Sequence, residues 1–101
     1  MTLTRPYKRG TSLFMYDKDN CIVWYVAKMT AENKAENVEW NKRWGKNLYD
    51  TDPTGEYMLI DGVGLRKENW RNREARDEYL DMWLCEMEEE MAYLLRTEFG
   101  L

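Results

Sequence analysis

The side chains that could perform chemistry in this sequence are carboxylates, tyrosines and two cysteines. The sequence contains no histidine and no glutamine, and Ser12 is its only serine. Serine–histidine and cysteine–histidine catalytic arrangements both need an imidazole base, so neither can be built here. The repeated carboxylates are explained by a helix period and not by a catalytic pair. We therefore assign no catalytic residue and expect a protein that is not an enzyme.

Metal sites are poorly supported by the same inventory. Common zinc sites need histidines or clustered cysteines, whereas Cys21 and Cys85 lie far apart, and we expect both thiols to be reduced and buried. Loop 50–55 has oxygen-bearing side chains at alternate positions, as a calcium loop does. Pro53 interrupts that pattern, and its last ligand position holds Asp61 where glutamate is usual. A turn explains the loop better, and we expect no metal and no cofactor.

Charge is distributed unevenly along the chain, whose formal net charge is −4. Residues 1–46 contain nine Lys and Arg against five Asp and Glu, whereas residues 47–101 contain six against fourteen. No apolar run approaches the roughly 20 residues that span a bilayer, and the basic N-terminus lacks the apolar stretch of a secretion signal. We expect a cytoplasmic protein, found in a host's cytoplasm if a mobile element encodes it.

The first structural element that the sequence predicts is a β-hairpin. Two segments rich in aromatic and β-branched residues, 13–16 and 21–29, flank an Asp- and Asn-rich turn at residues 17–20. Both faces of the second strand are apolar, so we expect both to be covered, either by the domain's helices or by another chain.

A first helix is expected directly after the hairpin. Thr30 is a good N-cap and Gly45 a good terminator, and the residues between them are helix formers. Trp40 and Trp44 lie one turn apart on this helix, beside a thin apolar stripe.

One further strand is expected after loop 50–55. Residues 56–60 have strand character, and Asp61-Gly62 favours a tight turn that would end the strand. Two alternatives stay open for residues 63–65, which could return as a short strand or lead directly into the next helix.

A single long helix over residues 67–99 is the clearest predicted element. Its apolar residues recur with the 3.6-residue period of a core-facing side; they are Leu80, Trp83, Leu84, Met87, Met91, Leu94 and Leu95. The predicted fold class is α+β, with a small antiparallel sheet, made by the N-terminal hairpin and one or two further strands, packed against a short helix and a long C-terminal helix. Residues 1–101 form one domain, in which the basic segment 1–10 could be flexible.

Two arginines complicate the start of this helix. Arg73 and Arg76 project on the side that becomes the core stripe one or two turns later. Either the core ends near them or they pair with carboxylates, since arginine is rarely buried alone. We favour the first alternative, in which the first two turns extend beyond the domain body.

The long helix also carries an acidic stripe. Like charges one turn apart destabilise a helix, and no Lys or Arg lies between Asp77 and Leu95. Six residues form the stripe: Glu74, Asp77, Glu78, Asp81, Glu88 and Glu89. One interpretation is a solvated face that keeps the protein soluble. The other is a binding face in which spaced carboxylates imitate the phosphates of a nucleic acid.

Aromatic residues exceed what one small core can enclose. Five tryptophans and seven tyrosines occur in 101 residues, and such residue types are enriched where proteins bind each other. A second stripe on the long helix, about opposite the core side, contains Ala75 with three larger residues. The predicted aromatic contact residues are Trp40, Trp44, Tyr79, Met82 and Tyr93.

These features favour a non-enzymatic inhibitor or regulator that occludes a basic, nucleic-acid-handling surface of a larger protein. Small acidic proteins of this kind occur among phage and plasmid counter-defence proteins, which is an analogy from composition alone. The alternative is a homodimeric structural or assembly protein, joined through Tyr79, Met82 and Tyr93 or through an edge strand. Direct nucleic-acid binding by the basic N-terminus is a third hypothesis, which the negative net charge disfavours.

Overall fold

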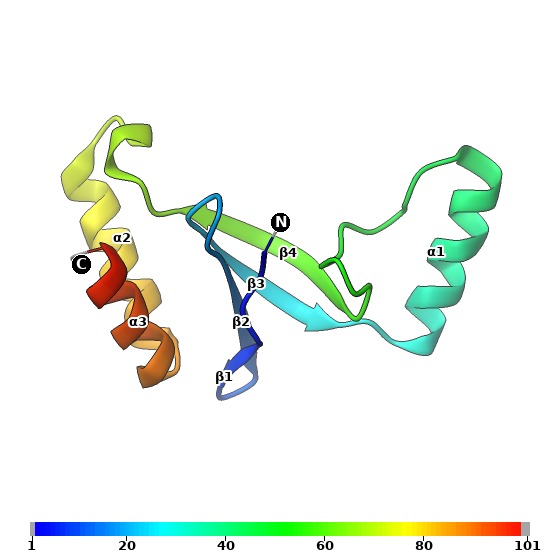
Figure 1. Cartoon of the computed structure of the whole chain (residues 1–101), viewed down its shortest axis with the longest axis horizontal. Coiled ribbons are helices and arrows are strands. Elements are labelled where there is room, and N and C mark those ends of the chain that lie inside the picture. The colour runs from blue at the N-terminus through cyan, green and yellow to red at the C-terminus, as the bar shows by residue number, and fades with distance from the viewer. Residues whose placement is uncertain (1, 100–101) are drawn as a thin grey trace.

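The computed structural model of the protein describes residues 2–99 and has an α+β fold, as predicted. The strands form one antiparallel sheet in the order β1-β2-β3-β4, so every strand pairs with its neighbours in sequence (Figure 1). The strands are β1 (Tyr7–Arg9), β2 (Ser12–Asp17), β3 (Ile22–Lys28) and β4 (Tyr57–Gly64). The helices are α1 (Ala31–Trp44), α2 (Arg73–Glu86) and α3 (Glu89–Phe99), and a short 3-10 helix, η1, covers Lys67–Asn69.

The predicted hairpin is confirmed as β2 and β3, which pair in antiparallel register from Leu13 opposite Val26 to Asp17 opposite Ile22. Asp17 fixes the turn between them. Its buried carboxylate accepts hydrogen bonds from the backbone amides of Asp19 and Asn20, at 3.1 and 3.2 Å. Local side-chain hydrogen bonding of this type is why aspartate favours turns.

The turn predicted at Asp61-Gly62 is wrong, because β4 continues through these residues to Gly64. Gly62 pairs with Trp24 of β3, and a Cβ atom added to Gly62 would lie 2.8 Å from the Trp24 ring. The glycine therefore makes room for a large side chain within the strand, which is a second common use of glycine in sheets. Val63 and Gly64 belong to the same strand and not to a returning one.

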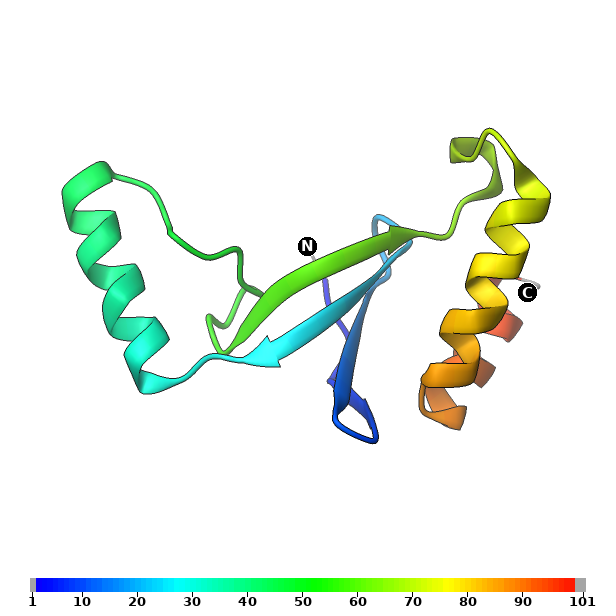
Figure 2. The same cartoon turned by 180° about the vertical axis from the view of Figure 1, so that it is seen from behind.

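The prediction of a single long helix over residues 67–99 is also wrong. α2 ends at Glu86, Met87 adopts an extended backbone with φ −85° and ψ 161°, and α3 begins at Glu89. α2 and α3 lie side by side at one end of the molecule (Figures 1 and 2). The helix break is stabilised by Met87 itself, which is 1% exposed and joins the core. Acidic residues favour a helix N-terminus, so the run of glutamates at 88–90 is well placed to begin α3.

The hydrophobic core lies between one face of the sheet and the pair α2 and α3. Its sheet side is aromatic: Phe14 lies 4.5 Å from Tyr25 and 5.8 Å from Trp83, measured between ring centroids. The residues predicted to face the core are buried, except that Leu94 is half-buried against the cluster. Two short helices with the same apolar period thus replace the one expected helix.

Two residues differ from expectation around this core. Arg76 is 1% exposed and forms an ion pair of 2.7 Å with Asp77, so the start of α2 does not extend beyond the domain body. Cys21 is buried as predicted, whereas Cys85 is exposed, because it lies on the side of α2 that faces away from the core. Both thiols are free.

α1 has the predicted bounds but not the predicted packing. Thr30 and Asn33 form a reciprocal capping box, and Gly45 ends the helix with φ +69°. No α1 residue is buried, and the helix stands apart from the sheet, at the end opposite α2 and α3 (Figures 1 and 2). The molecule measures 44 × 29 × 20 Å, and its radius of gyration of 15.2 Å exceeds the value of about 13 Å for a compact domain of this length.

Candidate functional site

The first candidate surface is the outer face of α2, which we define by Glu74, Glu78, Tyr79, Asp81 and Met82. Their spacing places them on the side of the helix that faces away from the core. Met82 is the most exposed apolar residue of this face, at 62%, and Tyr79 is exposed at its edge. The outer face of α2 thus combines two exposed apolar or aromatic side chains with three carboxylates.

The carboxylates of the outer face form no ion pair with the part of the chain that the structure describes. Among the described residues, no Lys or Arg lies within ion-pair distance of Glu74, Glu78 or Asp81. Asp77 differs from them, because it is held by the buried guanidinium of Arg76. Asp77 therefore has a structural partner, and we do not count it in the outer face.

The other residues predicted to share these stripes lie elsewhere, because the break after Glu86 ends the alignment. Glu88 is half-buried in the connection, Glu89 is the first residue of α3, and Tyr93 lies on α3 with 67% of its surface exposed. The predicted exposure of Tyr93 is correct. Its place in one continuous stripe with Tyr79 and Met82 is wrong.

Tyr79 connects the outer face to the aromatic core. Its ring lies 6.1 Å from that of Trp70 and 6.0 Å from that of Trp83, and Trp83 lies 4.3 Å from Tyr25. The Tyr25 hydroxyl donates a 2.6 Å hydrogen bond to the Glu86 carboxylate. Burial, followed by this hydrogen bond and the charge of Glu86, raises the pKa of Tyr25 to about 12.

This raised pKa predicts a loss of stability at alkaline pH. The folded protein favours protonated Tyr25, so the associated stability is fully present below the unfolded pKa of about 10 and is lost as the pH rises toward 12. In Tyr25→Phe, the melting temperature should fall less between pH 10 and 12 than in the wild type. Tyr93→Phe removes an exposed phenol and should keep the wild-type slope. Equal slopes in all three proteins would contradict the assignment.

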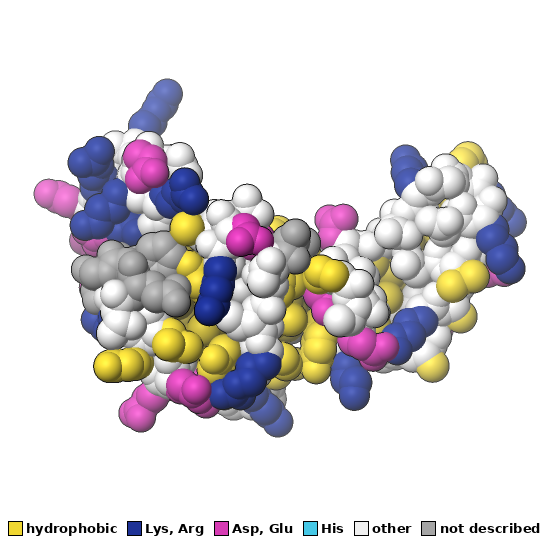
Figure 3. Space-filling view, in the orientation of Figure 1, with side chains coloured by type: hydrophobic (Ala, Val, Ile, Leu, Met, Phe, Trp, Pro, Cys, Tyr) yellow, Lys and Arg dark blue, Asp and Glu magenta, His cyan; other side chains and the backbone are white. Residues whose placement is uncertain are grey.

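The second candidate surface is the arm, which we define as α1 with the following loop to residue 49. Trp40 and Trp44 are exposed, as predicted, with ring centroids 5.8 Å apart, and Val38 and Leu48 are exposed as well. Figure 3 shows hydrophobic side chains on the surface of this end of the molecule. The exposure of Leu48 beside α1 could not be predicted from the sequence, because its segment has no regular period that would indicate which side chains face the helix.

A groove of about 590 Å³ runs along the arm. Three of its lining residues are apolar, namely Ala35, Trp40 and Leu48, and four are charged: Glu32, Glu36, Glu39 and Arg43. The carboxylates belong to the first part of α1, whereas Arg43 lies in its last turn together with Lys42. The groove thus changes from acidic to basic along its length.

Hydrogen bonds hold the loop against α1. The Asn37 side-chain oxygen accepts from the backbone amides of Leu48 and Tyr49, at 2.8 and 3.3 Å. The Tyr49 hydroxyl donates to Glu36 at 2.8 Å. These bonds fix the shape of the groove without burying its apolar residues.

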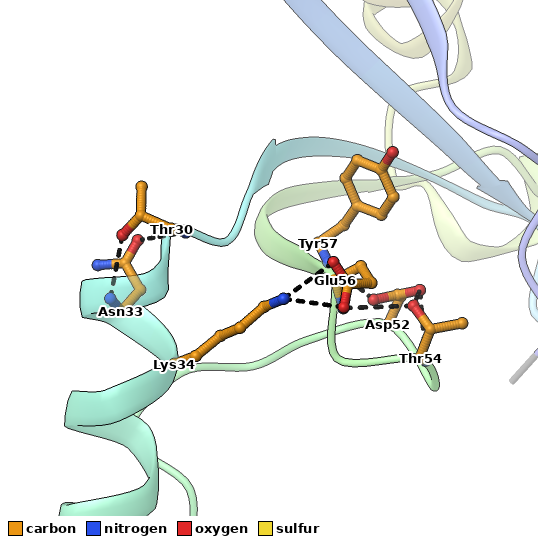
Figure 4. Close-up of polar contacts among 7 residues, drawn as sticks. All are labelled: Thr30, Asn33, Lys34, Asp52, Thr54, Glu56 and Tyr57. Carbon is orange, nitrogen blue, oxygen red and sulfur yellow. Dashed lines mark hydrogen bonds and ion pairs between the residues drawn. The ribbon is translucent and has the colours of Figure 1, made fainter.

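The base of the arm is joined to the sheet by polar contacts (Figure 4). Lys34 of α1 pairs with Glu56 at 2.9 Å. Asp52 accepts from the Tyr57 amide at 2.9 Å and from the Thr54 hydroxyl at 2.5 Å. Burial alone would raise the pKa of Asp52, but these hydrogen bonds outweigh it and hold the pKa below its usual value. The carboxylate therefore organises a turn, as expected for loop 50–55.

The basic N-terminal segment is engaged with the domain. Arg5 pairs with Glu90 at 2.7 Å, and its guanidinium lies 4.3 Å from the centroid of the Tyr7 ring. Tyr7 belongs to β1 and is buried in the core cluster. Stacking of nucleic-acid bases on this tyrosine is therefore blocked in the folded protein.

Within residues 2–99, no three His, Cys, Asp or Glu side chains lie close enough together to hold a metal ion. No helix in that range is both long and apolar enough to cross a bilayer. Comparisons with protein-family models, with curated proteins and with solved structures find no match to this chain.

Proposed function

We propose that this chain is a non-enzymatic binding protein whose outer face of α2 docks on a basic surface of a larger, nucleic-acid-processing protein. One observation carries the proposal: Met82 is 62% exposed on a rigid helix, among carboxylates that have no cationic partner in the described residues. Such a face combines a desolvation anchor with an electrostatic field that attracts cations.

The chemistry of the face supports a basic target. Glu74, Glu78 and Asp81 recur at intervals of four and three residues, so they form a row on one side of α2. A Lys- and Arg-rich surface that normally contacts phosphates would find a similar row of negative charges on α2. Binding of this type excludes nucleic acid from the target and needs no catalytic group, which agrees with inhibition or regulation.

The test compares proteins captured by the immobilised wild type and by the triple variant Glu74→Gln, Glu78→Gln, Asp81→Asn. The wild type should capture a nucleic-acid-binding protein that duplex DNA then releases, because DNA and the outer face compete for one surface. The triple variant should capture at least about tenfold less, as expected when several charge pairs are lost.

A control variant carries neutral substitutions at Asp19 and Glu68, two exposed carboxylates that belong to neither candidate surface, and should capture as much as the wild type. Asp77 is left unchanged because it stabilises Arg76. Equal capture by the triple variant, with the fold verified by circular dichroism, would overturn the proposal.

A further inference from the structure

The end of the arm combines exposed tryptophans with a local excess of positive charge. We call this surface the arm tip and define it by five residues: Trp40, Lys42, Arg43, Trp44 and Lys46. Residues 40–48 are all exposed, and the stretch 40–49 contains three Lys or Arg and no Asp or Glu. Figure 3 shows basic and hydrophobic side chains together at this end of the molecule. The arm tip is therefore basic and aromatic, although the net charge of the chain is −4.

The two indole rings are more accessible than is usual for tryptophan. Tryptophan is highly buried on average, whereas Trp44 is 58% exposed and Trp40 is 37% exposed. Their ring centroids lie 5.8 Å apart, which is less than the roughly 7 Å that a base needs between two rings at about 3.4 Å per stacked layer. Each indole therefore offers its exposed surface to a separate ligand group.

The cations of the arm tip are available to an anionic ligand. Within residues 2–99, neither Arg43 nor Lys46 lies within ion-pair distance of a carboxylate. Lys42 has one contact, at 3.8 Å from Glu39, between two side chains that are each more than 70% exposed. Such an exposed pair is weak, so it can be exchanged for another anion at little cost.

Hydrogen bonds keep the last cation beside the helix. Gly45 ends α1 with φ +69°, and its amide donates to the Asn41 carbonyl at 2.8 Å. The Asn41 side chain donates to that of Asn47 at 3.0 Å. Lys46 lies between these two contacts and is therefore held close to the last turn of α1, next to the two tryptophans.

We propose that the arm tip binds a single strand of nucleic acid, with bases stacked on Trp40 and Trp44 and with phosphates neutralised by the three cations. A ligand of this surface has to alternate flat π faces with negative charges, which is the chemistry of an unpaired strand. Stacking on aromatic side chains tolerates any base, and a basic surface that follows the backbone supplies the remaining affinity. A duplex fits less well, because its bases are already stacked on each other.

The acidic part of α1 limits where the strand lies. Glu32, Glu36 and Glu39 all precede the arm tip on the same helix. Their charge repels phosphates from the first turns of α1, so the strand crosses the C-terminal end of the helix and does not follow its whole length. The negative end of the helix dipole lies at this end as well, and the cations of the last turn offset it.

This inference goes beyond the proposed function, because it uses the opposite end of the molecule from the outer face of α2 (Figure 1). The outer face is complementary to a basic protein surface, whereas the arm tip is complementary to nucleic acid itself. A chain with both surfaces could hold a strand while it is docked on a nucleic-acid-processing protein.

The test titrates the full chain with fluorescein-labelled oligo(dT) and oligo(U) of 15 nucleotides and records anisotropy together with tryptophan emission. At about 50 mM salt the tighter strand should bind with a dissociation constant of about 1–100 μM and quench part of the emission. The tighter of the two identifies the natural strand as DNA or RNA. A labelled duplex of the same length should bind at least about tenfold more weakly.

Substitution of the tryptophans tests the stacking. Trp40→Leu and Trp44→Leu keep apolar, helix-forming side chains at exposed positions, and each should weaken binding of the strand about tenfold. The double variant should also lose the quenching of emission. Val38→Ala is the control, because Val38 is 53% exposed on α1 but lies on the opposite side of the helix from the tryptophans, and it should bind as the wild type does.

Salt dependence tests the cations. Three neutralised phosphates predict a fall in affinity of about 20-fold between 50 and 200 mM salt, whereas one remaining cation predicts about threefold. The variant Arg43→Gln, Lys46→Gln should therefore bind more weakly at 50 mM salt and show the smaller fall. The control variant Lys67→Gln, Arg71→Gln removes two exposed cations from the other end of the molecule and should keep the larger one.

Several results would overturn the inference. A wild type that binds neither strand at 50 mM salt would do so, even if a protein partner covers the tryptophans instead. Binding that both tryptophan variants leave unchanged, or that the control variant at Lys67 and Arg71 weakens as much, would place the strand elsewhere. None of these variants alters the outer face of α2. Protein capture through a strand on the arm tip would persist in the triple variant, so the two tests fail in distinguishable ways.

Discussion

The Leu84→Asp variant is expected to be unfolded in buffer at room temperature. Leu84 is 5% exposed and belongs to the cluster that joins α2 to the sheet. Removing the leucine costs about 2–5 kcal/mol in burial and cavity formation, and burying a carboxylate without a partner adds several kcal/mol. The whole domain is stable by only about 5–15 kcal/mol, so the sum reaches its total stability.

Circular dichroism and urea titration check this prediction. Met82→Asp is the matched control, two positions away on the same helix, with a side chain that is 62% exposed. It should cost no more than about 0.5 kcal/mol, as substitutions on solvated surfaces usually do. Cooperative melting of Leu84→Asp near the wild-type temperature would show that the core is not where the structure places it.

The features that sequence reasoning predicted correctly are governed by local interactions. The turn at Asp17 and the capping of α1 by Thr30 and Gly45 depend on hydrogen bonds and dihedral angles within a few residues. Their chemistry is visible in the sequence, so their positions could be predicted closely. Gly62 shows the limit of this approach, because its role depends on Trp24 of another strand.

The break between α2 and α3 could not be predicted from the apolar period. Leu84, Met87 and Met91 are spaced by three and four residues, which is the spacing of an uninterrupted helix. The chain leaves the helical conformation because two short helices can both lie against the same core. The extended backbone of Met87 is therefore selected by tertiary packing. The glutamates at 88–90 suit the start of α3, but within an uninterrupted apolar period they do not by themselves indicate a helix break.

The residue types of the two candidate surfaces could be predicted from the sequence, but their arrangement in space could not. The exposure of Trp40, Trp44, Tyr79, Met82 and Tyr93 follows from a surplus of aromatic and apolar residues over core volume. Which of them share a surface depends on the helix break and on the separation of α1 from the sheet. Neither feature has a period or a motif that the sequence displays.

The Asp77→Ala variant is expected to lose about 2–4 kcal/mol of stability, which is unusual for a half-exposed carboxylate. Asp77 is the counter-ion of Arg76, a side chain that is 1% exposed and whose Nε atom has no hydrogen-bond partner in the described residues. Without Asp77, the guanidinium keeps the Leu65 carbonyl as its hydrogen-bond acceptor but has no opposing charge. Leaving the buried Arg76 charge without its counter-ion is strongly destabilising.

Removing the buried charge as well should reverse this effect. Arg76→Met keeps most of the side-chain volume and should cost about 1 kcal/mol, chiefly for the Leu65 carbonyl, because Asp77 remains hydrated. The double variant Arg76→Met, Asp77→Ala should therefore be more stable than Asp77→Ala alone. Asp81→Ala, on the outer face of α2, is the control and should lie within about 0.5 kcal/mol of the wild type. Urea titrations of the wild type and the four variants give the coupling energy between Arg76 and Asp77. A value near zero would mean that the two side chains do not form an ion pair in solution.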